Sequence, residues 1–193
     1  MGKVYFLRSY SLESFLSSHL PVSYSGAMTE TPDAVDRITA QWRRERPDLD
    51  PSPMGILGRI SRIAVLAQRE FEREFARHGL AASDFDVLAA LRRAGSPFEL
   101  KPGVLSTSTM TTTGGMTKRL DRLEERGLIR RTDDPGDRRG KLIVLTDEGR
   151  VLVDLAVESH LRNEERMLAS LAPAHRDQLV ALLRPLLIAL EDG

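Results

Sequence analysis

The chain has 193 residues, of which 41% are hydrophobic and 29% are charged, a balance typical of a soluble globular domain with a substantial core. Its formal net charge is zero, so any surface for nucleic acid must be a local basic patch. The sequence has no cysteine, which excludes disulfides, thiol redox sensing and cysteine-ligated zinc. The histidines are scattered without the spacing of a metal site, and no apolar run is long enough to span a bilayer.

Residues 1–27 differ in composition from the remainder of the chain, because they are rich in Ser, Tyr and Leu. Their apolar stretch is short for a signal peptide, and Glu13 and His19 interrupt it. We interpret this segment as a vector-derived or upstream-start extension that is disordered or loosely ordered. The natural protein is then expected to begin at Met28, and residues 28–193 to form a single domain.

Two helices are predicted in the following part of the chain. Residues 31–46 form the first, with Asp33 as its N-terminal cap, and the prolines at positions 47, 51 and 53 make a stiff connector after it. Residues 52–78 form a long amphipathic helix that Gly79 ends. Apolar residues recur three or four positions apart, as Val35, Ile38 and Trp42 in the first helix and Met54, Leu57, Ile60, Ala64, Ala67, Phe71 and Phe75 in the second.

Three short helices and a two-stranded hairpin are predicted next. Ser83 is placed to cap the first of these helices, while Gly95 and Gly127 supply stops after the first and the third. The hairpin contains the turn-forming sequence Asp134-Pro135-Gly136-Asp137. The helices span about 83–93, 101–109 and 111–126, the strands 128–131 and 142–145, and the polar turn 132–141.

Two helices complete the chain. Thr146 caps a long helix that extends to about residue 171, and a last helix covers about 173–190, where Pro185 should introduce a kink. The order of elements predicts a mainly α protein with a small β wing and does not suit an α/β enzyme. The sequence also lacks a P-loop and a nucleophile elbow, so we expect no catalytic residues, no metal site and no cofactor.

The segment 105–131 carries the clearest chemical signal, because a helix rich in Thr, Lys and Arg follows a short helix and a turn. Such side chains can reach base edges and phosphates in a major groove. From Thr117 to Lys141 there are nine basic and six acidic residues, a local excess in a neutral chain. The alternative is a solvated helix surface whose Leu120 and Leu123 face the core.

The predicted hairpin tip carries Asp137, Arg138, Arg139 and Lys141. Basic side chains there extend furthest from the core, and an arginine can enter a minor groove, whose narrow form concentrates negative potential. Taken alone, this segment is better interpreted as a solubilising turn.

These features together resemble the MarR family of transcriptional regulators. The resemblance rests on residues 79–148 and on four motifs: Arg119-Leu120-Asp121-Arg122-Leu123-Glu124, Gly127-Leu128-Ile129, Asp137-Arg138-Arg139 and Leu145-Thr146-Asp147-Glu148-Gly149. It implies a MarR-like winged helix-turn-helix over residues 80–145. It also implies an obligate homodimer formed by the helices at 52–78 and 146–190.

The resemblance further implies a cytoplasmic, sequence-specific DNA-binding regulator, a repressor by the family's default, that binds a pseudo-palindromic operator in double-stranded DNA. Arg139 is expected in the minor groove, with Asp137 orienting it through a charge-assisted hydrogen bond. The DNA contacts expected are Ser106, Thr107, Thr111, Thr112, Thr113, Thr117, Lys118, Arg122, Arg138, Arg139 and Lys141.

Within the family, the extra helix with its tryptophan and the proline connector is similar to the PecS-like, urate-responsive branch. That branch implies a ligand site of Trp42, Asp86, Arg119 and Arg131. Guanidinium groups match the planar acceptors of urate, while a carboxylate accepts its ring N–H groups. We hypothesise that the anion repels Asp86, which moves its helix, and that Arg119 transmits this movement to the helix at 111–126, which the resemblance implies is the recognition helix.

Each ligand residue also has a simpler interpretation. Asp86 can serve the start of its own helix, since Ser83-Asp84-Phe85-Asp86 has a capping-box pattern. Trp42 can pack the extra helix, Arg119 can contact phosphate, and Arg131 can be an exposed strand charge. The effector can also be another small anion, such as an aromatic acid or a tricarboxylate. A winged helix that binds a partner without regulating genes is the remaining alternative.

Overall fold

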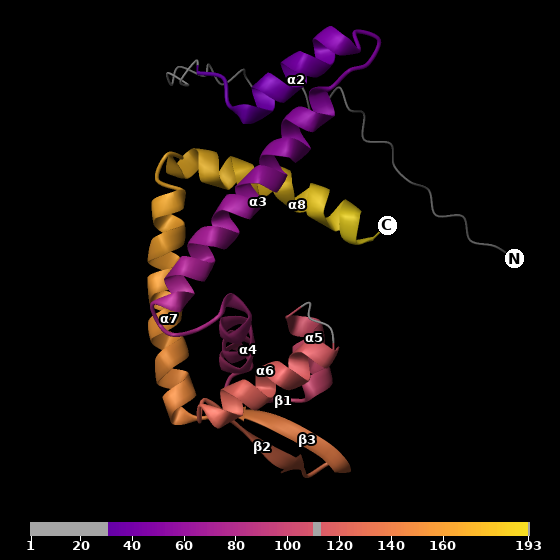
Figure 1. Ribbon diagram of the computed structural model, residues 1–193. Helices are drawn as coiled ribbons and strands as arrows, with labels where there is room; N and C mark the ends of the chain where they lie inside the picture. The colour runs from indigo at the N-terminus through magenta and orange to yellow at the C-terminus, as the bar shows by residue number, and fades with distance from the viewer. Residues whose placement is uncertain (1–30, 110–112, 193) are drawn as a thin grey trace, which may run out of the picture. The chain divides into compact units, whose positions relative to one another are not determined.

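The computed structural model describes residues 31–109 and 113–192, and the expectation about residues 1–27 lies outside that range. Backbone contacts divide the chain into two compact units with a boundary between Gly58 and Arg59, and each unit is described by itself. The described elements are α2 (Ala34–Glu45), α3 (Ser52–Ala76), α4 (Ala82–Arg93), β1 (Glu99–Leu100), α5 (Pro102–Ser108), α6 (Thr113–Glu125), β2 (Ile129–Asp134), β3 (Asp137–Leu145), α7 (Asp147–Met167) and α8 (Pro173–Glu191) (Figure 1).

The first unit contains α2 and the start of α3. A capping box begins α2: Asp33 Oδ1 accepts hydrogen bonds from the backbone N–H groups of Val35 (2.7 Å) and Asp36 (2.9 Å), and the Asp36 carboxylate accepts from the Asp33 N–H. The cap predicted at Asp33 is therefore confirmed. Val35 and Thr39 are buried, and the Val35 side chain lies beside Gly58, so α2 packs through this edge.

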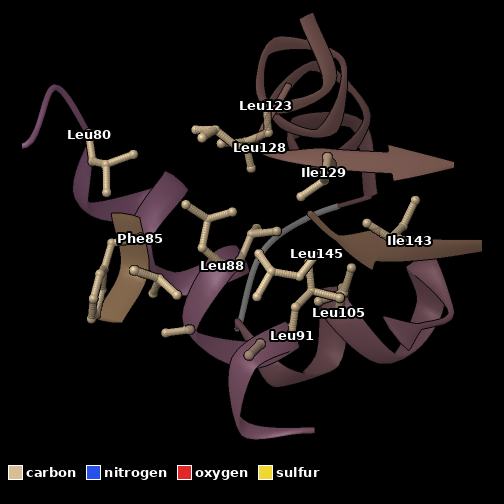
Figure 2. Close-up of a cluster of buried hydrophobic side chains, with 14 of the residues drawn as sticks. Leu80, Phe85, Leu88, Leu91, Leu105, Leu123, Leu128, Ile129, Ile143 and Leu145 are labelled. Atoms are coloured by element: carbon tan, nitrogen blue, oxygen red, sulfur yellow. The ribbon is translucent and has the colours of Figure 1, made fainter. Parts of the chain in front are cut away.

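The core of the second unit lies where α4, α5 and α6 meet the sheet and α7 (Figure 2). Leu88 and Leu91 of α4, Leu105 of α5 and Leu123 of α6 have no exposed side-chain area. Truncating one such leucine to alanine usually destabilises a protein by about 2–5 kcal/mol. These side chains fix the position of α6, the candidate recognition helix, relative to α4 and α5.

Three glycines end helices as predicted, and Gly127 shows the reason. Gly79, Gly95 and Gly127 have φ angles of 65°, 77° and 70°, in the left-handed region that favours glycine. At Gly127 the chain reverses, so that the Leu128 N–H donates to the Leu123 carbonyl (3.0 Å). This turn directs the chain from α6 straight into β2.

The sheet is antiparallel with strand order β1-β3-β2, and Arg131 pairs with Ile143 in its register. The prediction of two short strands around a long polar turn was wrong in extent. β2 and β3 continue to Asp134 and Asp137, leaving only Pro135 and Gly136 between them, and β1 adds a third strand. Backbone hydrogen bonds extend the hairpin beyond the core, where its side chains need not alternate between apolar and polar. The sequence pattern therefore could not predict the ends of β2 and β3 near the turn.

The cap predicted at Ser83 was also wrong. Helix α4 begins at Ala82, its N-cap is Ala81, and no side-chain cap bond is present there. The Ala81 carbonyl already accepts from the N–H groups of Asp84 (2.9 Å) and Phe85 (3.1 Å), which leaves Ser83 inside the first turn. Asp86 therefore does not complete a capping box with Ser83.

Thr146 joins the start of α7 to the end of α6. Its hydroxyl accepts from the Gly149 N–H (3.0 Å) and donates to the Gly127 carbonyl (2.7 Å), which confirms the predicted cap. Helix α8 continues through Pro185 without ending there, and it has no buried residue. In the described part of the chain, no helix combines the length and hydropathy needed to cross a membrane.

Candidate nucleic-acid interface

Helix α6 has one face in the core and another toward solvent. Met116, Leu120 and Leu123 are buried, as the sequence pattern predicted for the two leucines. Thr117 and Lys118 are exposed on the same helix. The buried leucines and the exposed polar residues lie on two different faces of this helix. Core packing on one face is therefore compatible with DNA contact on the other.

Arg122, predicted to contact DNA, forms an ion pair inside the protein. Its guanidinium donates to both carboxylate oxygens of Asp84, with Nε 3.2 Å from Oδ2. The Asp84 side chain is 3% exposed and the Arg122 side chain 49%. Contact with Asp84 raises the pKa of Arg122 above its ordinary value. The pair ties α6 to α4, so Arg122 positions the helix whatever else it touches.

Helix α5 carries the predicted contacts Ser106 and Thr107. Each hydroxyl donates back into its own helix, Ser106 to the Pro102 carbonyl (3.1 Å) and Thr107 to the Gly103 carbonyl (3.2 Å). Both hydroxyl oxygens keep acceptor capacity, and Thr107 is exposed. Of the remaining predicted contacts in this region, Thr111, Thr112 and the side chain of Thr113 lie outside the described residues.

The wing hairpin has an irregular register near its tip. Asp133 pairs with Lys141 while Asp134 pairs with Asp137, so the three residues Arg138, Arg139 and Gly140 of β3 are additional to the ladder. This stretch is a bulge, which we call the wing bulge. Lys141 forms a salt bridge with Asp133 on the exposed side of the hairpin. The side chains of Arg138 and Arg139 lie outside the described residues, so the contact between Asp137 and Arg139 stays a prediction.

Asp86 and Arg119, two of the predicted ligand residues, lie within electrostatic reach of each other. Burial raises the pKa of Asp86, while Arg119, Arg93 and His160 act in the opposite direction. Asp86 is thus an exposed carboxylate that neighbouring groups partly desolvate, with several cationic or titratable neighbours. This is the environment in which an added anion would be repelled by the acid and attracted by the arginine.

Arg131 is held by two acids of α6 instead of being a free strand charge. Its guanidinium contacts Asp121 Oδ1 (Nη2 at 2.6 Å) and the Glu124 carboxylate, which also accepts the Arg131 backbone N–H (2.9 Å). Burial lowers the pKa of Arg131, but the two carboxylates together raise it above its ordinary value. Arg131 lies in the middle of β2, not at the strand end as predicted, and it joins the wing to α6.

Trp42, the fourth predicted ligand residue, belongs to the first unit. It lies on α2 with 44% of its surface exposed, and its carbonyl accepts the backbone N–H of Arg46 (2.8 Å). Trp42 is thus not buried in the core of that unit.

Four acids and one lysine organise this region although the sequence did not predict a role for them. Asp84, Asp121 and Glu124 hold arginines, and Asp134 forms a salt bridge with Lys101. Asp84 had a usable signal, because it lies one turn before the apolar run from Val87 to Leu91 on the same helix, a run in which every residue is buried. The other partners depend on the register of the hairpin, for which the local sequence carries no signal.

Comparison with known proteins agrees with this geometry. The sequence profile of the MarR family matches residues 78–140. The chain is 42% identical over 149 residues to the HTH-type transcriptional regulator PecS of Dickeya dadantii, a match that covers 77% of this chain and 90% of that protein.

Solved structures show the same fold. A MarR family regulator from Streptomyces coelicolor, crystallised in complex with DNA, has a TM-score of 0.66 at 23% identity and covers 74% of this chain and 89% of its own. Bordetella bronchiseptica BpsR, whose DNA binding is regulated by 6-hydroxynicotinic acid, has a TM-score of 0.60 at 28% identity and covers 68% and 91%.

Proposed function

Since the chain belongs to the MarR family of winged helix-turn-helix transcriptional regulators, a non-enzymatic family, we propose that it is a repressor released from its operator by urate. In this proposal a homodimer binds a pseudo-palindromic site in double-stranded DNA. Two α6 helices enter successive major grooves, and two wings reach the flanking minor grooves. The observation that carries the proposal is the outward face of α6, which presents Thr117 and Lys118 on a helix anchored by its buried face.

The homodimer is supported by apolar surface that the single chain leaves uncovered. Monomeric proteins rarely expose large contiguous apolar patches, and α8 buries none of its residues in the second unit. In a two-fold dimer, the same surface of each copy covers the other. The exposed apolar residues of the C-terminal helices are Val151, Leu155 and Leu161 on α7, Leu168 at the C-cap of α7, and Leu179, Val180, Leu182, Leu183, Leu187, Ile188 and Leu190 on α8.

The effector response is supported by the charges around the start of α4 and the wing. Urate is a planar monoanion, so Arg119 and Arg131 can bind its acceptors while Asp86 faces its ring N–H groups. Binding at Arg131 would compete with Asp121 and Glu124, the two α6 acids that now hold it. The role of Trp42 rests on the resemblance to the PecS-like branch alone.

Coupling of this kind typically amounts to about 1–3 kcal/mol, enough to release a repressor at modest ligand excess. In the proposed sequence of events, the anion adds negative charge beside Asp86 and draws Arg119 and Arg131 away from their present partners. Both arginines lie next to α6 or on it, so the recognition helix shifts relative to the wing.

A mobility-shift titration on the DNA upstream of the chain's own start codon tests the proposal. We expect binding that survives excess heparin, and release on addition of urate. The variants Asp86→Asn and Trp42→Phe should bind the DNA and respond weakly to urate. An unchanged urate response in both variants would refute the pocket, while failure of the unmodified protein to prefer the duplex over heparin would refute the regulator itself.

A second candidate effector is an aromatic acid, favoured by the 6-hydroxynicotinic acid that regulates BpsR. The same titration with 6-hydroxynicotinic acid and with citrate in place of urate separates the candidates. Release by only one of the three identifies the class of anion, because the arginines attract all of them while their shape, charge and hydrogen-bonding groups differ.

A further inference from the structure

Lys101 links the start of α5 to the tip of the wing. It stands directly between β1 and α5, where it is the N-cap residue, and its Nζ lies 2.7 Å from Asp134 Oδ2. Asp134 is the last residue of β2, and its side chain is only 9% exposed. A salt bridge between two exposed side chains contributes little to stability. Here one partner is a nearly buried carboxylate whose position is fixed.

The other oxygen of Asp134 organises the turn. Asp134 Oδ1 accepts the Gly136 N–H (2.9 Å), so this carboxylate closes the turn on one side and holds Lys101 on the other. Its neighbourhood is crowded, since a Cβ added at Gly140 would lie 3.1 Å from both Asp134 Cβ and Asp137 Cβ. Asp134 therefore lies beside the wing bulge. It is the residue of β2 at which pairing resumes, with Asp137, after the pair of Asp133 and Lys141.

Charge and geometry agree at this pair. Lys101 and the Gly136 N–H lower the pKa of Asp134, and the Asp134 carboxylate raises the pKa of Lys101. Without Lys101, an unpaired negative charge would remain beneath the segment that carries Arg138 and Arg139.

We propose that Lys101 and Asp134 are positioning residues for DNA binding: their salt bridge fixes the backbone of the wing bulge, the segment that carries Arg138 and Arg139, in the conformation that meets the duplex. The inference rests on the proposed function, since it needs a wing that touches DNA. Its distinctive consequence is the sign of a charge effect. Removing an acid near a polyanion normally strengthens binding, whereas removing Asp134 should weaken it.

The experiment compares the DNA affinity of Asp134→Asn with that of Asp133→Asn in the full-length protein at one salt concentration. Asp133 is the matched control, because it lies one residue away and pairs with the exposed Lys141 on the same hairpin. We expect Asp134→Asn to lose about fivefold or more, the equivalent of one ordered contact. Asp133→Asn should bind as well as the unmodified protein or better. Thermal unfolding checks that each variant is folded.

Lys101 needs a second comparison, because its own charge could touch a phosphate. If it acts through the wing, Lys101→Met should weaken binding in the unmodified background and cause no further loss when Arg138 and Arg139 are already alanine. Lys101→Arg, which can keep the salt bridge, should restore most of the affinity.

Two results would overturn the inference alone: Asp134→Asn binding as tightly as Asp133→Asn, or Lys101→Met losing as much affinity with the wing arginines removed as with them present. If instead the alanine variant of Arg138 and Arg139 binds DNA normally, the wing's proposed role fails, and the inference fails with it.

Discussion

Arg122 of α6 binds the buried carboxylate of Asp84 on α4, a residue 38 positions earlier in the chain. Both oxygens of Asp84 are engaged, so the guanidinium satisfies a group that burial alone would destabilise. The pair joins α4 and α6, which both contribute buried leucines to the core of the second unit. The orientation of α6 is thus held by apolar packing from one side and by this ion pair from another.

Replacing Arg122 with methionine should lower the free energy of unfolding by about 2–3 kcal/mol, since it strands a buried carboxylate while keeping the side-chain stem. The figure is below the full range for buried pairs because Arg122 is half exposed. Urea denaturation at a fixed protein concentration measures it. Arg150→Ala, which removes an exposed pair with Asp147, is the control and should change stability by less than about 0.5 kcal/mol. Normal stability with weakened DNA binding would show that Arg122 serves the duplex instead.

Gly149, in the first turn of α7, has no room for a side chain. A Cβ there would lie 2.0 Å from the Leu128 carbonyl oxygen and 2.9 Å from Leu145 Cδ1. Gly149→Ala should therefore destabilise the protein by about 2 kcal/mol or more, because backbone must move. Gly103→Ala is the control, since a Cβ there meets nothing within 4 Å and the helix should gain up to about 1 kcal/mol. Similar melting temperatures for the two variants would contradict the close approach of α7 to β2.

Asp86 predicts a pH dependence with a definite sign. The side chain of Asp86 is exposed, but partial desolvation raises its pKa above the ordinary value of 3.8, so folding slightly favours the neutral acid. At neutral pH the ionised carboxylate costs stability, and Asp86→Asn should melt at a higher temperature than the unmodified protein. The difference should shrink as pH falls through the raised pKa and vanish below the ordinary one. A variant that is less stable at neutral pH would mean that attraction by Arg119 outweighs burial.

Lys118 is exposed on α6 and is expected to contact a phosphate. Lys118→Ala should weaken binding to all duplexes similarly and reduce the slope of log affinity against log salt by about 1 for each subunit that makes the contact. Fluorescence anisotropy over a range of salt concentrations measures this slope. Arg162→Ala removes an exposed arginine of α7 and should leave the slope unchanged. A selective loss for one sequence would place Lys118 on a base edge.

The exposed leucines of α8 predict the oligomeric state. Leu182 is 72% exposed in the single chain, and a glutamate there would be buried without a partner in a dimer. Leu182→Glu should shift the protein toward monomer in sedimentation analysis and weaken operator binding. Val104→Glu is the control for the oligomeric state, because Val104 is 47% exposed on α5, outside the helices of the proposed interface. A dimer that tolerates Leu182→Glu would exclude this face of α8.

The predicted ligand residues show what local sequence patterns can and cannot predict. Asp86 and Arg119 were predicted from the family resemblance, and the structure brings them within electrostatic reach. Arg131 was expected as a strand end, yet hairpin register places it in mid-strand and against two acids of α6. Such pairing depends on residues far apart in the chain, and no local spacing encodes it.

By itself, the sequence determined where helices begin and end at Asp33, Gly127 and Thr146, and which face of α6 is buried, because caps, left-handed glycines and helical periodicity act within a few residues. Only the tertiary structure decided the partners of Arg122, Arg131 and Lys101, because those partners are acids that packing brings near them. A salt bridge across 33 or 38 residues is a consequence of the fold as a whole, because loop closure and core packing must fix both ends first.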